Sequence, residues 1–158
     1  MVLRLLLGTV YTAMAAGQLA SADRMPQILA AYGAVDGIAA AVLAGGLIAG
    51  ELLCGVWFLT RPRSTALVPV WVYTAVSVAW SALAVQAYAR GLTVTNCGCF
   101  GVYLTQRLTW FVLVQDALTL LYAALLLRGA RRASAAPAQT GGSDDRPHDK
   151  HAAKAETR

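Results

Sequence analysis

Residues 35–59 read VDGIAAAVLAGGLIAGELLCGVWFL, and Asp36 and Glu51 are the only charged side chains in this stretch. An α-helix rises about 1.5 Å per residue, so a stretch of this length can cross the roughly 30 Å of hydrocarbon in a bilayer. In lipid, a helix also satisfies its backbone amides within its own segment. The stretch therefore predicts a membrane-spanning helix.

Three further apolar segments have the same character and similar lengths. They are residues 2–19, 67–89 and 108–127. None of the four shows the alternation of polar and apolar residues that is expected of membrane barrel strands. The sequence predicts an all-α fold, a polytopic membrane four-helix bundle that forms one domain over residues 1–130.

The remainder of the chain, residues 131–158, is rich in Ala, Pro, Gly, Ser and charged residues and has no hydrophobic periodicity. A segment of this kind buries too little apolar surface to fold alone. We expect it to be a disordered tail on the cytoplasmic side.

Composition supports lipid as the main solvent of the chain. Of its 158 residues, 58% are hydrophobic and only 13% are charged, whereas about 25% are charged in a typical soluble domain. The net charge of +5 comes largely from basic residues beside the apolar segments and in the tail. No basic face interleaved with aromatic residues points to nucleic acid, so we expect none as a partner.

The arginines beside the segments predict the orientation. With the N-terminus inside, six of them lie on the inner side, namely Arg4, Arg61, Arg63, Arg128, Arg131 and Arg132, and three on the outer side, namely Arg24, Arg90 and Arg107. Cytoplasmic loops carry the excess of basic residues, so we expect both termini inside and the plasma membrane as the location. Ala20-Ser21-Ala22 leaves a cleaved signal sequence as an alternative for the first segment, which would leave the other three oriented as before.

Cys97-Gly98-Cys99 then lies in an outer loop, in an oxidising compartment where disulfides persist. A disulfide between residues two apart closes a very small ring, so the backbone must turn, and Gly98 and Gly101 permit such a turn. The resulting strain raises the reduction potential, which favours an electron acceptor. Flanking arginines, Arg107 in particular, are candidates for stabilising a thiolate.

Two other readings of the pair stay open, a structural disulfide and part of a metal site. A bridge across one residue constrains almost no loop and would stabilise little. A zinc site needs further ligands on the same side, and the sequence offers no other outward Cys or His. We expect no metal site.

Two acidic residues lie inside predicted spans, Glu51 in residues 35–59 and Asp116 in residues 108–127. Such residues face the bundle interior and have partners. Helix rise places Asp116 about 12 Å and Glu51 about 20 Å from the outer edge, so a chain of polar groups is favoured over a direct pair. They serve either a proton relay or quinone contact, or a polar clasp between helices, and the candidate partners are Gln18, Tyr11, Tyr73 and Gln115.

Cys54 is predicted to serve packing and not redox chemistry. It continues a ridge of small residues with Gly46 and Gly50, of the kind that lets membrane helices approach closely. A second ridge of this kind is Gly37, Ala41, Gly45 and Ala49.

Residues 96–101, Asn-Cys-Gly-Cys-Phe-Gly, followed by a helix with Gln115-Asp116, resemble the methylamine utilisation protein MauE family. Residues 50–55 and 59–61 resemble the wider DoxX-like group. The resemblance covers about residues 1–130 and leaves out the tail.

The resemblance implies a four-helix membrane protein that helps to form or move disulfides during methylamine dehydrogenase maturation, beside an extracytoplasmic thioredoxin-like protein. It implies redox roles for Cys97 and Cys99 and supporting roles for Glu51 and Asp116. DsbB-type and vitamin K epoxide reductase-type enzymes have two cysteine pairs, whereas this chain has one outward pair. Its electrons must therefore pass to a quinone, the one cofactor considered, or to another protein. A non-enzymatic assembly factor and a small transporter remain the alternatives.

Overall fold

A computed structural model describes residues 1–64 and 66–135, and this part of the chain is helical without strands. Its helices are α1 (Val2–Leu19), α2 (Met25–Ala30), α3 (Gly37–Thr60), α4 (Val68–Ala89) and α5 (Trp110–Ala135). All but the short α2 are long and apolar enough to cross a membrane. The predicted all-α membrane four-helix bundle is confirmed.

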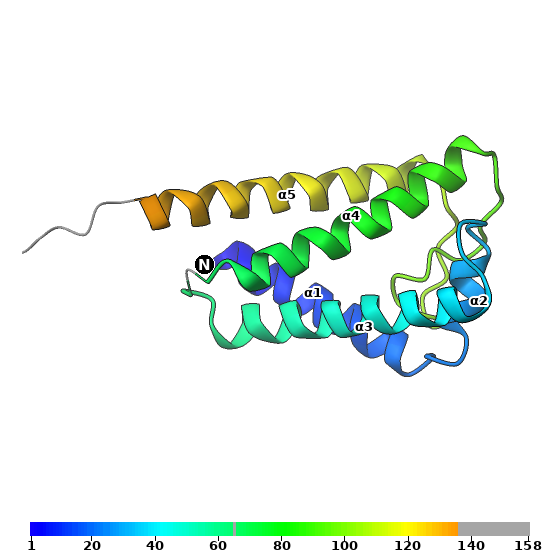
Figure 1. The fold of residues 1–158 in the computed structure, drawn as a ribbon, viewed down its shortest axis with the longest axis horizontal. Coiled ribbons are helices and arrows are strands. Elements are labelled where there is room, and N and C mark those ends of the chain that lie inside the picture. The colour runs from blue at the N-terminus through cyan, green and yellow to red at the C-terminus, as the bar shows by residue number, and fades with distance from the viewer. Residues whose placement is uncertain (65, 136–158) are drawn as a thin grey trace, which may run out of the picture.

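The helices α3, α4 and α5 lie along one another, and α1 crosses α3 at an angle (Figure 1). In the described residues, α1 packs mainly on α3, and α5 packs mainly on α4. The N-terminus, the link between α3 and α4 and the end of α5 lie at one end of the bundle, whereas α2 and the loop between α4 and α5 lie at the other (Figure 1). We call the second end the cysteine end, because its loop carries Cys97 and Cys99.

The first three spans begin and end within two residues of the predicted bounds. The last one does not, because α5 continues to Ala135, past the predicted end at residue 127. Residues 131–135, predicted to belong to a disordered tail, are therefore helical. Ala and Arg are good helix formers and no proline occurs between Trp110 and Pro137, so nothing stops the helix at the membrane edge. The rest of the predicted tail, residues 136–158, lies outside the described residues.

The contact between α1 and α3 depends on two glycines. A Cβ atom at Gly8 would lie 3.0 Å from the carbonyl oxygen of Gly55, and one at Gly55 would lie 2.8 Å from the backbone nitrogen of Thr12. The two backbones therefore touch, as small residues allow in membrane helices. At the opposite end from the cysteines, Arg4 donates a hydrogen bond to the carbonyl of Ser64 and so holds α1 against the link.

The predicted ridges of α3 are only partly correct. Cys54 is fully buried in the core, and a Cβ atom at Gly50 would lie 2.7 Å from Val76, so this part of the first ridge packs as predicted. The second ridge is wrong as a contact within the chain, because Gly45 has nothing within 4 Å of a built Cβ atom and lies exposed.

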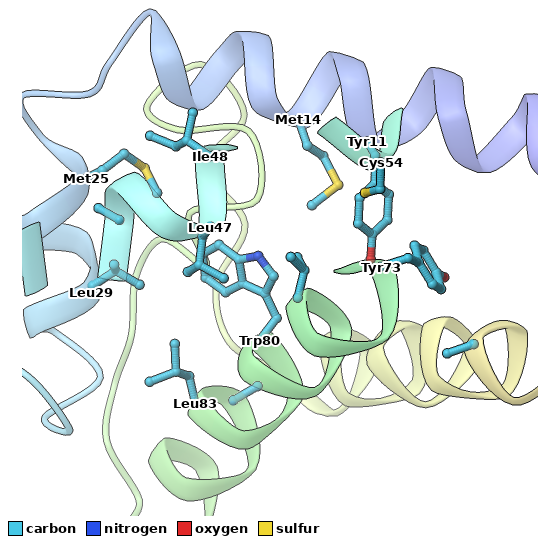
Figure 2. Packing of buried hydrophobic residues seen from close by; sticks show 14 of the residues in the cluster. Tyr11, Met14, Met25, Leu29, Leu47, Ile48, Cys54, Tyr73, Trp80 and Leu83 are labelled. Atoms are coloured by element: carbon cyan, nitrogen blue, oxygen red, sulfur yellow. The ribbon is translucent and has the colours of Figure 1, made fainter. Parts of the chain in front are cut away.

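A continuous apolar core joins the helices near the cysteine end. Figure 2 shows Trp80 reaching from α4 toward α1 and α3, where Met14 and Leu47 lie. Below the loop, Leu29 of α2 is fully buried. The short α2 is therefore part of the packed structure on which the cysteine loop lies.

Candidate functional site

The cysteines lie on a loop that folds back against the bundle. Two backbone hydrogen bonds tie its two arms together, from Cys97 to the carbonyl of Gln106 at 2.8 Å and from Leu108 to that of Val94 at 2.9 Å. This pairing leaves residues 98–105 as the tip of the loop. Cys97 is only 1% exposed although it belongs to a connecting loop.

Glycines turn the backbone around the thiols, as the sequence predicted. Gly98 has φ of +80° and Gly101 has φ of +63°, and residues that carry a side chain rarely adopt such values. Asn96 fixes the turn, because its side chain accepts a hydrogen bond from the Gly98 nitrogen and donates one to the Gly101 carbonyl, both at 2.9 Å. The turn brings the two cysteine side chains to the same side.

Helix α1 and the connection that follows α2 anchor this turn through side chains that the sequence analysis did not assign to it. The hydroxyl of Tyr32 donates to the carbonyl of Cys97 at 2.8 Å, and the amide of Gln18 donates to that of Cys99 at 3.2 Å. Tyr32 is 1% exposed, and burial raises the pKa of its hydroxyl, which therefore stays a neutral donor. In the sequence, Tyr32 was marked only by its place in the outer connection between the first two spans, far along the chain from the cysteines.

The loop also presses closely on the end of α1. A Cβ atom at Gly17 would lie 2.8 Å from the carbonyl oxygen of Phe100. Ser21 is buried, and its hydroxyl accepts a hydrogen bond from the nitrogen of Val102 at 3.3 Å. These contacts make the last turn of α1 a part of the site.

Cys97 and Cys99 are free thiols whose sulfurs lie 3.2 Å apart. A disulfide needs about 2.05 Å, so a shift of roughly 1 Å joins them. In the neutral pair Cys97 donates to Cys99. When Cys97 is ionised, the Cys99 thiol donates to the thiolate and lowers the pKa of Cys97 to about 7, against an ordinary value of 9.0. The same bond and burial raise the pKa of Cys99.

The more acidic of the two cysteines is the less accessible one. Cys97, the more acidic thiol, is buried, whereas Cys99 is partly exposed. Direct attack on Cys97 therefore requires the turn at residues 97–101 to lift from the helices, whereas Cys99 is partly accessible without it.

The flanking arginines lie away from the sulfurs. Arg90 donates instead to the carbonyl of Gly33 at 2.8 Å. Arg107 is exposed and lines a surface groove with Tyr88 and Leu92, and in the described part of the chain no recorded contact joins it to either cysteine. The hydrogen bond within the pair, not an arginine, accounts for the lowered pKa of Cys97.

Glu51 lies fully buried in α3 and finds a partner that the sequence analysis missed. The indole nitrogen Nε1 of Trp80 donates to its Oε1 at 2.6 Å, while Oε2 has no hydrogen-bond partner. A buried indole N–H needs an acceptor, and this general rule was the available signal. The same Trp80 ring would lie 3.4 Å from a Cβ atom at Gly98, so it connects the acid to the cysteine turn.

Of the polar groups named as candidate partners of the two acids, Gln18 does interact with Glu51, whereas the two tyrosines bond elsewhere. The hydroxyl of Tyr11 shares a hydrogen bond with Ser77 at 2.9 Å, and that of Tyr73 donates to the carbonyl of Thr119 at 3.1 Å. Gln18 holds the cysteine turn, although its side chain also lies beside Glu51. These bonds link α1 to α4 and α4 to α5.

Asp116 lies on the wall of a cavity of about 200 Å³ between α1, α4 and α5, which we call the α1–α5 cavity. Its lining residues that carry polar atoms are Tyr11, Ser77, Trp80, Cys99, Gln115, Asp116, Thr119 and Tyr122. The Oδ2 atom of Asp116 is buried without a hydrogen-bond partner. The structure therefore brings Cys99 and Asp116 to one cavity, next to Trp80 and its partner Glu51.

No metal site accompanies these groups in residues 1–64 and 66–135, where no three acidic, cysteine or histidine side chains gather as ligands. What the site offers is a close thiol pair, buried carboxyl groups and an apolar cavity. Four apolar helices around such a site define a multi-pass membrane protein with a thiol pair at one end of its bundle.

The chain belongs to the methylamine utilisation protein MauE family, whose model matches residues 1–129. It is thus a membrane protein of the methylamine utilisation type, as the resemblance of residues 96–101 implied. The match ends before the tail and includes every candidate site residue. No curated protein and no solved structure matches the chain.

Proposed function

We propose that Cys97 and Cys99 cycle between dithiol and disulfide and exchange electrons with an extracytoplasmic thioredoxin-like protein. The observation that carries the proposal is the pair itself, two free sulfurs 3.2 Å apart of which one has a pKa of about 7. A thiolate is the attacking species in exchange, and a pKa near ambient pH is the best compromise between its abundance and its reactivity.

The exchange begins with the disulfide form of this chain. A thiolate of the partner attacks one sulfur and forms a mixed disulfide, and the other cysteine leaves as a thiolate. The partner's second thiolate then breaks the mixed disulfide. The partner ends oxidised, this chain ends as the dithiol, and two electrons have moved. In the proposed direction, Cys97 suits the leaving group because the lower pKa leaves faster.

The proposal includes an orientation in the plasma membrane. The cysteine end faces the oxidising side, with both termini in the cytoplasm, as the six inner and three outer arginines favour. In the family, the process served would be maturation of a methylamine-oxidising enzyme. Glu51 and Asp116 support the pair from the bundle interior, and Arg107 lies in the groove beside the loop.

Trapping of a mixed disulfide tests this function. Single variants Cys97→Ser and Cys99→Ser are incubated in native membranes with a thioredoxin-like protein that lacks its resolving cysteine and whose remaining cysteine carries thionitrobenzoate as a mixed disulfide. The remaining loop thiolate attacks this activated cysteine and releases thionitrobenzoate, so no other oxidant is needed. Oxidation of the reduced partner with both cysteines present is measured separately. We expect a mixed disulfide with at least one of the two, and loss of partner oxidation with both. Cys54→Ser is the matched control, because Cys54 is buried in the core away from the loop and should leave partner oxidation unchanged.

The opposite result would favour an assembly factor or transporter. In that result, Cys97→Ser and Cys99→Ser oxidise the partner as the unmodified chain does and form no trapped complex, whereas Glu51→Gln loses function. An impermeant maleimide added with and without reductant gives an independent measurement, because sulfurs that never change reactivity do not cycle.

A further inference from the structure

The dithiol that remains after exchange must lose two electrons before it can act again. The chain provides one cysteine pair at the cysteine end, and Cys54, the third cysteine, lies buried in the core. The electrons therefore leave through a molecule that can reach the pair. The α1–α5 cavity is where such a molecule has access.

Cys99 forms part of the wall of this cavity, together with Trp80 and Asp116. Cys99, the partly exposed residue of the pair, therefore borders the space between membrane helices, although the loop that carries it belongs to the end of the bundle. An oxidant soluble in the membrane can reach Cys99 there while the turn stays closed.

The size and lining of the cavity select the class of molecule. An apolar cavity of about 150 Å³ is enough to hold benzene, and the α1–α5 cavity measures about 200 Å³. It therefore takes one small substituted ring. Most of the surface that faces the cavity is apolar, including that of Leu7 and Met14, while the buried Oδ2 of Asp116 lacks a hydrogen-bond partner.

The cavity has a natural entrance from the bilayer. Val10 of α1 and Leu118 of α5 both line it, and they are 45% and 46% exposed. In the described residues α1 and α5 do not pack extensively on each other, so the rim between them faces lipid. A ring with a long apolar tail fits this arrangement, because the tail can stay in the bilayer.

We propose that the α1–α5 cavity binds the ring of a membrane quinone and that the Cys97–Cys99 dithiol reduces it there. This inference rests on the proposed function, since it supplies the acceptor for the exchange reaction. As the S–S bond forms, the two cysteines release two electrons and two protons. The quinone ring takes both electrons, and its two carbonyl oxygens take both protons and become hydroxyls. Asp116 lies in position to pass one of these protons.

The first test measures quinone reduction by the full chain in lipid nanodiscs under anaerobic conditions. The probe is decylubiquinone, whose fully substituted ring does not form thiol adducts. We expect the dithiol protein to form one quinol for each disulfide. Leu118→Trp fills the rim and should slow this reaction at least about tenfold, the effect of a steric cost of about 1.4 kcal/mol. Leu121→Trp is the matched control on α5, since Leu121 is also exposed but does not line the cavity.

A second measurement detects binding without electron transfer. In Cys97→Ser no intramolecular disulfide can form, and bound decylubiquinone should protect Cys99 from alkylation. Adding Leu118→Trp to this variant should remove the protection, whereas Leu121→Trp should keep it.

The results distinguish this inference from the proposed function. Equal quinone reduction in Leu118→Trp and Leu121→Trp, or no reduction by a dithiol that still exchanges with the thioredoxin-like protein, overturns the quinone site and leaves a lipid chain as the occupant. Loss of exchange with the thioredoxin-like protein in the unmodified chain would instead overturn the proposed function.

Discussion

Cys97 and Cys99 have similar sequence surroundings but different acidity, and the difference arises from the geometry of one turn. Burial alone would raise the pKa of both thiols. The hydrogen bond across 3.2 Å stabilises whichever sulfur is ionised, and Cys97 is the one whose pKa falls, to about 7. Cys99 then keeps its proton and has a raised pKa. The pair thus loses its first proton near pH 7 and keeps the second at higher pH.

The pH dependence of alkylation tests this assignment. The thiolate fraction of Cys97 rises with pH, so its reaction with iodoacetamide should be half-maximal near pH 7 and fall about tenfold for each unit below. Opening of the turn scales the rate without moving this midpoint. Cys99→Ala removes the donor while burial remains, so the midpoint should move up by at least about one unit. Mass spectrometry of the Cys97 peptide measures the rate.

A matched variant separates the hydrogen bond from packing. Cys99→Ser retains a donor at the same position, so its midpoint should move less than that of Cys99→Ala. Superimposable profiles for Cys97 in the unmodified chain and in Cys99→Ala would contradict the assignment.

At this scale the sequence predicted the turn but not the division of roles within it. Gly98 and Gly101 act locally, so their positive φ angles could be anticipated from the short Cys-x-Cys spacing. Tyr32 and Gln18 come from other parts of the chain and hold the turn by bonds to its carbonyls. Composition and spacing do not show which residues of such distant segments lie next to each other.

At the scale of helices, α1 and α3 pack where a glycine, which has no side chain, lets the two backbones touch. The sequence predicted close approach on α3 but could not decide which of its many small residues face a neighbour. Gly55 faces α1, at Gly8 and Thr12, whereas Gly45 faces open space. The hydrophobic pattern is of little help here, because a membrane helix is apolar on every face.

Alanine substitutions on α3 test this interface. A Cβ atom at Gly55 would lie 2.8 Å from the Thr12 backbone nitrogen, which cannot move aside without shifting α1. Gly55→Ala should therefore lower the free energy of unfolding by about 1–3 kcal/mol. Gly45→Ala has open space and should be neutral or stabilising by up to about 1 kcal/mol. Thermal unfolding of both variants in nanodiscs, followed by loss of helical circular dichroism, compares them. Equal stabilities would show that α1 does not pack on Gly55.

For the whole molecule, the number of spans followed from segment length, but the α1–α5 cavity did not. Its existence depends on the order of packing, with α1 on α3 and α5 on α4, which leaves a space between the first and the last helix. From the helix rise we predicted that Asp116 and Glu51 lie at different depths in the membrane. In the structure the two acids have different neighbours. The role of Trp80 between them required the side-chain geometry.

Which side of the membrane the cysteine end faces decides whether the thiol pair can hold a disulfide. Two single-cysteine reporters, Leu104→Cys in the loop and Gly129→Cys near the end of α5, are placed in a Cys97→Ser, Cys99→Ser background. Leu104 is 62% exposed, and Gly129 has nothing within 4 Å of a built Cβ atom, so both positions accept the change. The buried Cys54 stays in place.

An impermeant maleimide on intact cells should label Leu104→Cys at once and Gly129→Cys only after the cells are permeabilised. The reason is the arginine excess beside Gly129 and at the link between α3 and α4, which favours the cytoplasm for that end. The reverse labelling pattern would place Cys97 and Cys99 in a reducing compartment, where thiols stay reduced. Exchange with an extracytoplasmic partner would then be excluded, however close the two sulfurs lie.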